Sequence, residues 1–98
     1  MKTLNNGWVE GSVQDFLELS DADMAYVETK LALARSLKET RTKQCLTQTD
    51  LARRLKTSQS RVARMEGGDP HVSVDLLLRG LFTLGVPRSR VAKSIQHH

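Results

Sequence analysis

Three side chains with directed hydrogen-bonding groups lie close together in the segment QSRVARME, which covers residues 59–66. A glutamine amide can pair with adenine through two hydrogen bonds, an arginine guanidinium can pair with guanine, and a serine hydroxyl suits either base. Val62 and Met65 lie among them, so a helix over this segment would bury these two residues and expose the polar ones. The residues expected to contact bases are Gln59, Ser60 and Arg64.

A second short helix is predicted immediately before this segment. Thr47 can accept a hydrogen bond from a backbone amide and so begin a helix from Gln48 to Leu55. Residues 56–58 form the turn that follows, and Ser58 can cap the helix over residues 59–66. Two short helices joined in this way form a helix-turn-helix, whose second helix can enter the major groove. A similar helical pair that only contacts another protein is the alternative.

Basic and polar side chains around the two short helices predict contacts with DNA phosphates. The free backbone amides at the N-terminus of the first helix favour an anion, so Gln48 is expected to approach a phosphate there. Residues 29–98 contain fourteen basic and five acidic residues, which favours a polyanionic partner. A basic surface that is only solvated is the alternative. The residues expected to contact phosphates are Gln48, Ser58, Arg61, Lys56, Arg53, Arg54 and Lys38.

A pattern of leucine, Thr-Gln, Leu-Ala, Ser-Gln, an aliphatic residue and Glu-x-Gly runs through both short helices. Its members are Leu46, Thr47, Gln48, Leu51, Ala52, Ser58, Gln59, Val62, Glu66 and Gly68. With this pattern, residues 35–86 resemble the Xre-type helix-turn-helix family of phage repressors. The resemblance implies a bundle like that of lambda repressor, a DNA-binding function, and DNA contacts by Gln48 and the three residues expected to contact bases.

The same resemblance implies a structural ion pair between Arg41 and Glu66, which would tie the preceding helix to the end of the second short helix. One position departs from the family pattern. The family has glycine in the turn where this chain has Lys56, because the backbone there is left-handed. A lysine in that conformation costs about 1 kcal/mol, part of which a nearby phosphate would offset.

The segment from Asp15 to Arg41 resembles a subgroup of Xre-type regulators that includes HigA-like antitoxins. Those proteins neutralise an RNase toxin and repress their own operon, so the resemblance implies a basic toxin as a second partner. The distribution of charge agrees with this implication. Residues 1–28 contain six acidic residues and one basic residue, and such a segment repels DNA and attracts a basic protein.

The remaining chain predicts three more helices, which makes the fold all-α with about five helices. Ser20 caps a long helix from Asp21 to about Thr40, Ser73 begins another over residues 74–84, and a last helix is expected over residues 88–96. Apolar residues recur along the long helix at intervals of three and four, which predicts one buried stripe. This stripe consists of Met24, Val27, Leu31, Ala34 and Leu37.

Two regions follow from this organisation. Residues 1–19 are interpreted as an N-terminal arm that can hold a short helix over residues 13–17, and residues 20–98 as one DNA-binding domain. Phe16 is expected to pack into the core, whereas Trp8 is left open between the core and a docking patch.

A homodimer is expected, because two-fold symmetry would place two recognition helices about 34 Å apart and match an imperfect inverted repeat in double-stranded DNA. The C-terminal region offers the most apolar side chains for a dimer interface, and the long helix over residues 21–40 is the other candidate. The C-terminal residues in question are Leu81, Phe82, Val86, Val91 and Ile95.

The other function classes find little support in the sequence. The chain shows no nucleophile and base at a catalytic spacing, no phosphate-binding glycine loop and no cluster of metal ligands, so neither an enzyme nor a cofactor is expected. No apolar run approaches the ~20 residues of a membrane span. A single cysteine, Cys45, favours a cytoplasmic location and is expected to be a small core residue.

Overall fold

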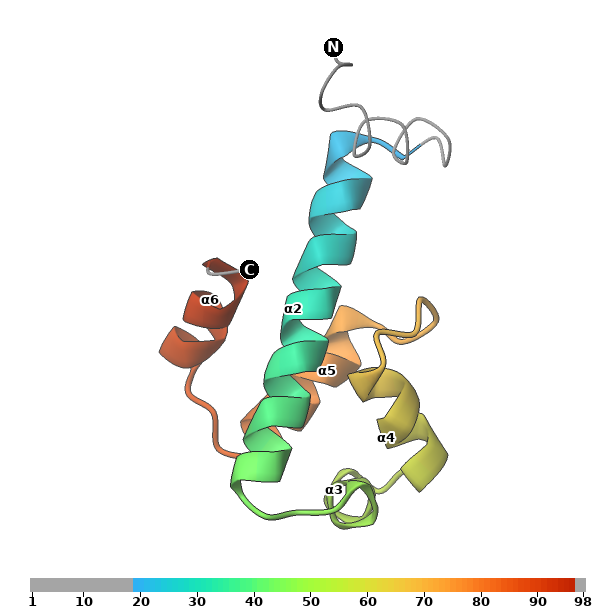
Figure 1. The fold of residues 1–98 in the computed structure, drawn as a ribbon, viewed down its shortest axis with the longest axis vertical. Coiled ribbons are helices and arrows are strands. Elements are labelled where there is room, and N and C mark those ends of the chain that lie inside the picture. Colours follow the sequence, from blue (N-terminus) through green and yellow to red (C-terminus); the bar gives the residue numbers. More distant parts are fainter. Residues whose placement is uncertain (1–18, 97–98) are drawn as a thin grey trace.

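The computed structural model describes residues 19–96, and within this range helices are the only regular secondary structure (Figure 1). The helices are α2 Asp21–Lys43, α3 Gln48–Leu55, α4 Gln59–Glu66, α5 Val74–Thr83 and α6 Arg88–Gln96. The prediction of an all-α helix-turn-helix bundle is therefore confirmed for this part of the chain. The predicted arm and its short helix over residues 13–17, with Trp8 and Phe16, lie outside the described residues.

The C-terminal half of α2 forms the centre of the bundle. Helices α4, α5 and α6 pack against α2, and α3 packs against α4 and α5 (Figure 1). Gly80 allows α5 to approach closely, because a Cβ atom at this position would lie 3.0 Å from Cδ1 of Leu37. Burial of one large aliphatic side chain stabilises a fold by about 1.5–3 kcal/mol. The largest fully buried side chains are Leu33, Leu37, Leu51, Met65, Leu77, Leu81 and Val62.

Four of the five helices in the described residues begin at the serine or threonine that the sequence predicts as the N-cap. The side chains of Ser20, Thr47, Ser58 and Ser73 each accept a hydrogen bond from the backbone amide of the third helical residue. In α2 and α3 that residue is an aspartate, and its carboxylate accepts the amide of the cap in return. Each cap stabilises its helix by about 1 kcal/mol, so these polar side chains determine where the helices start.

The first half of α2 is not buried, and the prediction of one continuous buried stripe is wrong there. Val27 and Leu31 are each 40% exposed, whereas Ala34 and Leu37 are buried as predicted. The physical reason is that α2 projects beyond the other described helices (Figure 1). None of residues 21–29 is buried, and burial begins at Lys30. The periodicity correctly identifies the apolar face but contains no information on what covers it.

Three of the five apolar residues predicted as a dimer interface belong to the core instead. Leu81, Val86 and Val91 are buried in the core cluster, because both α5, which carries Leu81, and α6, which carries Val91, pack against α2. Only Phe82 and Ile95 of this group remain exposed, at 46% and 37%. The C-terminal region therefore offers two exposed apolar side chains rather than five.

Two turns place a non-glycine residue in the left-handed region. Lys56 ends α3 with φ 58°, the left-handed conformation that the resemblance to the Xre-type family implies for this turn. Cys45 has φ 59° and is exposed, so the expectation of a small core residue is wrong. The left-handed turn after α2 leaves Cys45 outside, and its neighbour Leu46 packs against the core instead.

Candidate nucleic-acid interface

Helices α3 and α4 pack together through small and aliphatic side chains. Leu51 and Ala52 of α3 are buried, as are Val62 and Met65 of α4. The amide of Thr57 donates to the carbonyl oxygen of Ala52 at 2.9 Å, which closes the turn between the two helices. Because these side chains point inward, the opposite face of α4 lies in solvent.

The three residues for which the sequence predicts base contacts lie on that outer face. Gln59 and Ser60 form the start of α4, and Arg64 follows one turn later. All three side chains belong to exposed residues. We call this set, Gln59, Ser60 and Arg64, the reading edge. A major groove accommodates one helix, so an exposed edge at the N-terminal part of α4 can reach base edges.

A chain of polar side chains connects the core of the bundle to the reading edge. Arg41 Nε lies 2.5 Å from Glu66 Oε2, and Arg41 Nη2 donates to Glu66 Oε1 at 2.9 Å. Gln48 Nε2 donates to the same Glu66 oxygen at 3.1 Å. Gln59 Nε2 donates to Gln48 Oε1 at 2.6 Å. We call these four residues the polar chain.

The ion pair at the base of the polar chain is largely shielded from water. The side chains of Arg41 and Glu66 are 10% and 2% exposed. Hydrogen bonding to Glu66 raises the pKa of Arg41, partly offset by desolvation, so the guanidinium stays charged. Arg41 Nη1 also donates to the carbonyl oxygen of Leu46 at 2.7 Å, which attaches α2 to the segment before α3. Charge-assisted hydrogen bonds of this kind are stronger than neutral ones. The pair therefore holds the Glu66 carboxylate in place, and this carboxylate orients Gln48.

The side chain of Ser58 caps the backbone at the start of α4, although the sequence predicts a phosphate contact for it. Its hydroxyl oxygen accepts the amide of Arg61 at 3.1 Å and lies 3.2 Å from the hydroxyl oxygen of Ser60. The hydroxyl hydrogen of Ser58 can still donate to an anion or to Ser60. The residue therefore orients the start of α4 whatever else it contacts.

The predicted phosphate contacts fall into separate places on the surface. Arg53 lies 3.4 Å from Asp50 with a side chain 74% exposed, a loose surface pair of little energetic value. Arg54 and Lys56 line a groove between α3 and α5. Lys38 lines a different groove, between α2 and the C-terminal end of α4.

The carboxylate of Asp50 mainly caps the start of α3, and its pair with Arg53 is secondary. Its carboxylate accepts the backbone amide of Thr47 at 2.9 Å, and this hydrogen bond is the main cause that lowers its pKa. Arg53 and Arg54 lower the pKa of Asp50 less.

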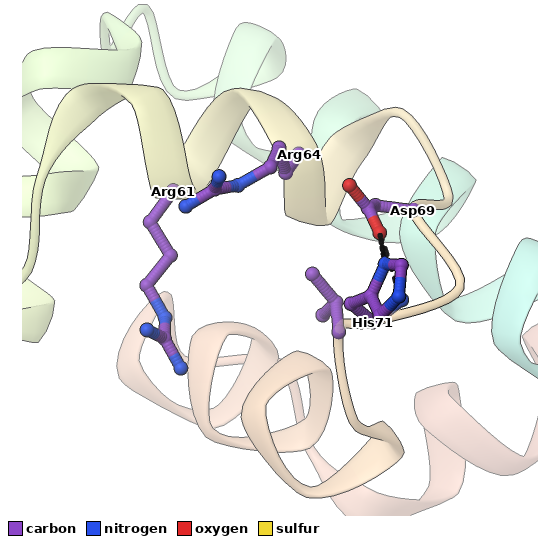
Figure 2. A pocket seen from close by; sticks show the side chains of 5 residues that line it. Arg61, Arg64, Asp69 and His71 are labelled. Atoms are coloured by element: carbon purple, nitrogen blue, oxygen red, sulfur yellow. Dashed lines mark hydrogen bonds and ion pairs between the residues drawn. The ribbon is translucent and has the colours of Figure 1, made fainter.

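A depression of about 280 Å³ lies beside the C-terminal part of α4. Figure 2 shows Arg61 and Arg64 extending from α4, with Asp69 and His71 on the loop that follows. Asp69 Oδ1 accepts the amide of His71 at 2.7 Å, which is the largest cause of the lowered pKa of Asp69. Asp69 and His71 were not among the predicted site residues. The sequence signal for them is the GGDP turn, which brings the next residues back alongside α4.

Comparison with known families agrees with this geometry. A family model described as a helix-turn-helix domain matches residues 32–93, well over half of the chain. The chain belongs to this family. Membership in a helix-turn-helix family indicates a DNA-binding regulator rather than an enzyme. The resemblance to the HigA-like subgroup stays a prediction, and neither the curated proteins nor the solved structures gave a match.

Within residues 19–96, no group of three or more histidine, cysteine, aspartate or glutamate residues could hold a metal ion. None of the helices described there has the length and apolar character needed to cross a membrane.

Proposed function

We propose that this helix-turn-helix protein is a sequence-specific regulator that binds double-stranded DNA as a homodimer and represses its own operon. The observation that carries the proposal is the hydrogen bond of 2.6 Å from Gln59 Nε2 to Gln48 Oε1 at the start of α4. Because Gln48 is itself attached to Glu66, the exposed amide of Gln59 is held in one orientation before any ligand arrives. Such preorganisation lowers the entropy cost of binding.

The orientation of Gln59 suits an adenine. A side-chain amide has two N–H donors and one acceptor oxygen. One donor is used by Gln48, so the second donor and the oxygen of Gln59 are left for the N7 and N6 positions of the base. Arg64, one turn along α4, has the reach and the donors for a guanine further into the site, and Ser60 lies between them.

Sequence-independent affinity would come from the cations around this edge. Arg53, Arg54, Lys56 and Arg61 are all exposed, and each is proposed to neutralise a phosphate together with the amides at the start of α3. Every phosphate neutralised releases counterions, so the logarithm of the binding constant should fall with the logarithm of salt by about 0.9 per contact.

The proposal is tested by titrating the upstream region of the gene and a scrambled duplex at two salt concentrations. We expect the upstream region to bind at least about 10³-fold more tightly than the scrambled duplex, with a steep salt dependence for both. Equal affinity for the two duplexes at both salt concentrations would overturn the proposal.

A second candidate function rests on the charge of the N-terminal region. The net charge of −5 over residues 1–28 is unfavourable beside DNA and complementary to a basic RNase. In this version the protein is an antitoxin, and DNA binding regulates its operon. Deletion of residues 1–19 should then weaken a complex with the product of the neighbouring gene and leave DNA affinity largely intact. If the two gene products do not associate on co-expression, the antitoxin role is excluded.

A further inference from the structure

A groove runs along the exposed side of α2. Its first part, about 180 Å³, is lined by Tyr26, Val27, Lys30, Leu31, Gly68 and Pro70. Its second part, about 270 Å³, is lined by Leu31, Ala34, Arg35, Lys38, Glu66, Gly67 and Gly68. The two parts share Leu31 and Gly68 and so adjoin each other beside residues 26–38 of α2, and we call them together the groove. At 1.5 Å per residue this stretch of helix is about 18 Å long.

The two ends of the groove differ in chemistry. At the first end Tyr26, Val27 and Leu31 are exposed large hydrophobic residues. Lys30 does not interrupt this apolar end, because its ammonium group is directed to the carbonyl oxygen of Pro70 at 2.9 Å and lies over the Tyr26 ring. At the other end the exposed residues Arg35 and Lys38 make the groove basic. An occupant must therefore be apolar at one end and acidic at the other.

The projecting part of α2, residues 21–29, also exposes an apolar face on which another surface can pack. Residues 21–29 form two and a half turns of helix at 3.6 residues per turn, and none of them is buried. A helical segment without buried side chains is marginal in water, and the exposed side chains of Tyr26, Val27 and Leu31 mark an interaction surface.

The charges along α2 indicate what packs there. Residues 21–29 contain three carboxylates, Asp21, Asp23 and Glu28, and no basic residue. Residues 30–43 contain five basic residues and one carboxylate. Two parallel copies of α2 would place like charges together, whereas two antiparallel copies place each acidic half against a basic half. The helix is thus complementary to itself in the antiparallel direction, as an isologous interface requires.

We propose that the groove is the dimer interface and that its occupant is α2 of a second copy of the chain, lying antiparallel. Val27 and Leu31 of each copy pack against Leu31 and Val27 of the other. The acidic start of each α2 lies over Arg35 and Lys38 of the other copy. This inference rests on the proposed function, because it supplies the two-fold symmetry with which the regulator is proposed to read an inverted repeat.

The arrangement leaves the reading edge accessible. Groove residues Glu66, Gly67 and Gly68 lie at the C-terminal end of α4, whereas Gln59 and Ser60 lie at its N-terminal end. It also gives Lys38 a role different from the phosphate contact predicted from the sequence. Lys38 pairs with carboxylates of the second copy, so removal of its charge affects the dimer before it affects DNA.

The test uses two charge-reversed variants of the full chain. The double substitution Arg35→Glu/Lys38→Glu makes both ends of the groove-facing stretch of α2 acidic. The double substitution Asp21→Lys/Glu28→Lys leaves Asp23 as the one carboxylate of residues 21–29 and gives that end a net positive charge. In sedimentation equilibrium without DNA we expect the wild type at twice the chain mass of 11.0 kDa and each variant alone at the chain mass. An equimolar mixture of the two variants should return to twice the chain mass, because opposite charges then meet at both ends. Phe82→Glu, on an exposed apolar residue outside the groove, should stay dimeric.

Recovery of the dimer in the mixture establishes the antiparallel interface, because misfolded variants would not associate specifically. Variants that remain dimeric alone, or a mixture that remains monomeric, would overturn it. A monomeric wild type that dimerises after removal of residues 1–18 would show that the chain's own N-terminal residues occupy the groove, which also overturns it. Binding of each monomeric variant to DNA with a single half-site is measured separately. Half-site binding with normal base preference shows that a failed dimer test does not reflect a failed DNA-binding function.

Discussion

The α3–α4 pair and the first half of α2 are both amphipathic, yet within residues 19–96 only the α3–α4 pair has its apolar face covered. In the α3–α4 pair, Leu51 and Val62 are fully buried and the outward polar side chains are tied into a hydrogen-bonded chain. In the first half of α2, Val27 and Leu31 remain exposed and the carboxylates are gathered at one end. A pattern of three and four residues thus specifies a helix and its apolar face, but another element of the structure must supply the covering surface.

The largest contrast between the two regions should appear when one carboxylate is removed from each. Glu66→Ala leaves Arg41 buried without its partner, and loss of one member of a buried pair costs about 3–5 kcal/mol. Glu28→Ala removes an exposed carboxylate from the first half of α2 and should change the free energy of unfolding of the monomer by less than about 0.5 kcal/mol. Urea denaturation measures both. Similar values for the two variants would contradict the structural role given to the polar chain.

Within the α3–α4 region, the reading edge should differ from the surrounding cations. Arg64→Ala should cost about 1–3 kcal/mol on the operator and relax preference at one base pair in each half-site. Arg53→Ala, which also removes an exposed arginine, should weaken operator and random DNA alike and reduce the salt slope by about 1. Fluorescence anisotropy on both duplexes separates the two outcomes. An equal loss on both duplexes for Arg64→Ala would remove this residue from the reading edge.

The two left-handed turns provide a smaller and closely matched pair. Lys56→Gly and Cys45→Gly each relieve a non-glycine residue near φ 58–59°, so each should raise the free energy of unfolding by about 1 kcal/mol. Only Lys56→Gly should also reduce the salt dependence of DNA binding, because Lys56 is proposed to contact a phosphate. Thermal unfolding and a salt titration of DNA affinity are the two measurements. If the salt slope of DNA binding is the same for both glycine variants, Lys56 does not contact a phosphate and only forms the turn.

The smallest expected effect is the loss of folding stability at low pH. The pKa of Asp50 and that of Asp69 are both lowered from 3.8, in each case first by a backbone amide that donates to the carboxylate. A lowered native pKa means that the stabilisation is present above the unfolded pKa and is lost as the pH falls through the native value. Unfolding at pH 7 and below pH 3.8 should therefore show a steeper loss of stability for the wild type than for Asp50→Asn and Asp69→Asn. Parallel curves would show that the protonation of these two carboxylates is not coupled to folding.

Much of the fold is predictable because its determinants are local. Ser20, Thr47, Ser58 and Ser73 begin the helices that they cap, and the turn at Lys56 follows from the spacing of the two short helices. These features depend on residues within one turn of each other, so a single sequence contains them. The exposure of the three residues of the reading edge follows from the same short-range periodicity.

Apart from the local turn that exposes Cys45, the errors concern relations between distant segments. Val27 and Leu31 are exposed because no described helix reaches the start of α2, whereas Leu81 and Val91 are buried because α5 and α6 both pack against α2. Periodicity alone cannot distinguish these two outcomes, since both groups are apolar and regularly spaced. The hydrogen bond from Gln48 to Glu66 joins residues 18 positions apart in the sequence, and local patterns likewise do not predict it.

The central claim is that the amide of Gln59, oriented by Gln48, reads a base, and a double-mutant cycle between Gln59→Ala and the base pair it contacts tests this most directly. Anisotropy titrations are made with the wild type and the variant, on the operator and on operators substituted at one position at a time. For each position they provide the four affinities of one cycle. The account predicts one adenine position in each half-site at which the wild type discriminates by about 1–3 kcal/mol and the variant does not. Full discrimination at every position by the Gln59→Ala protein would contradict it.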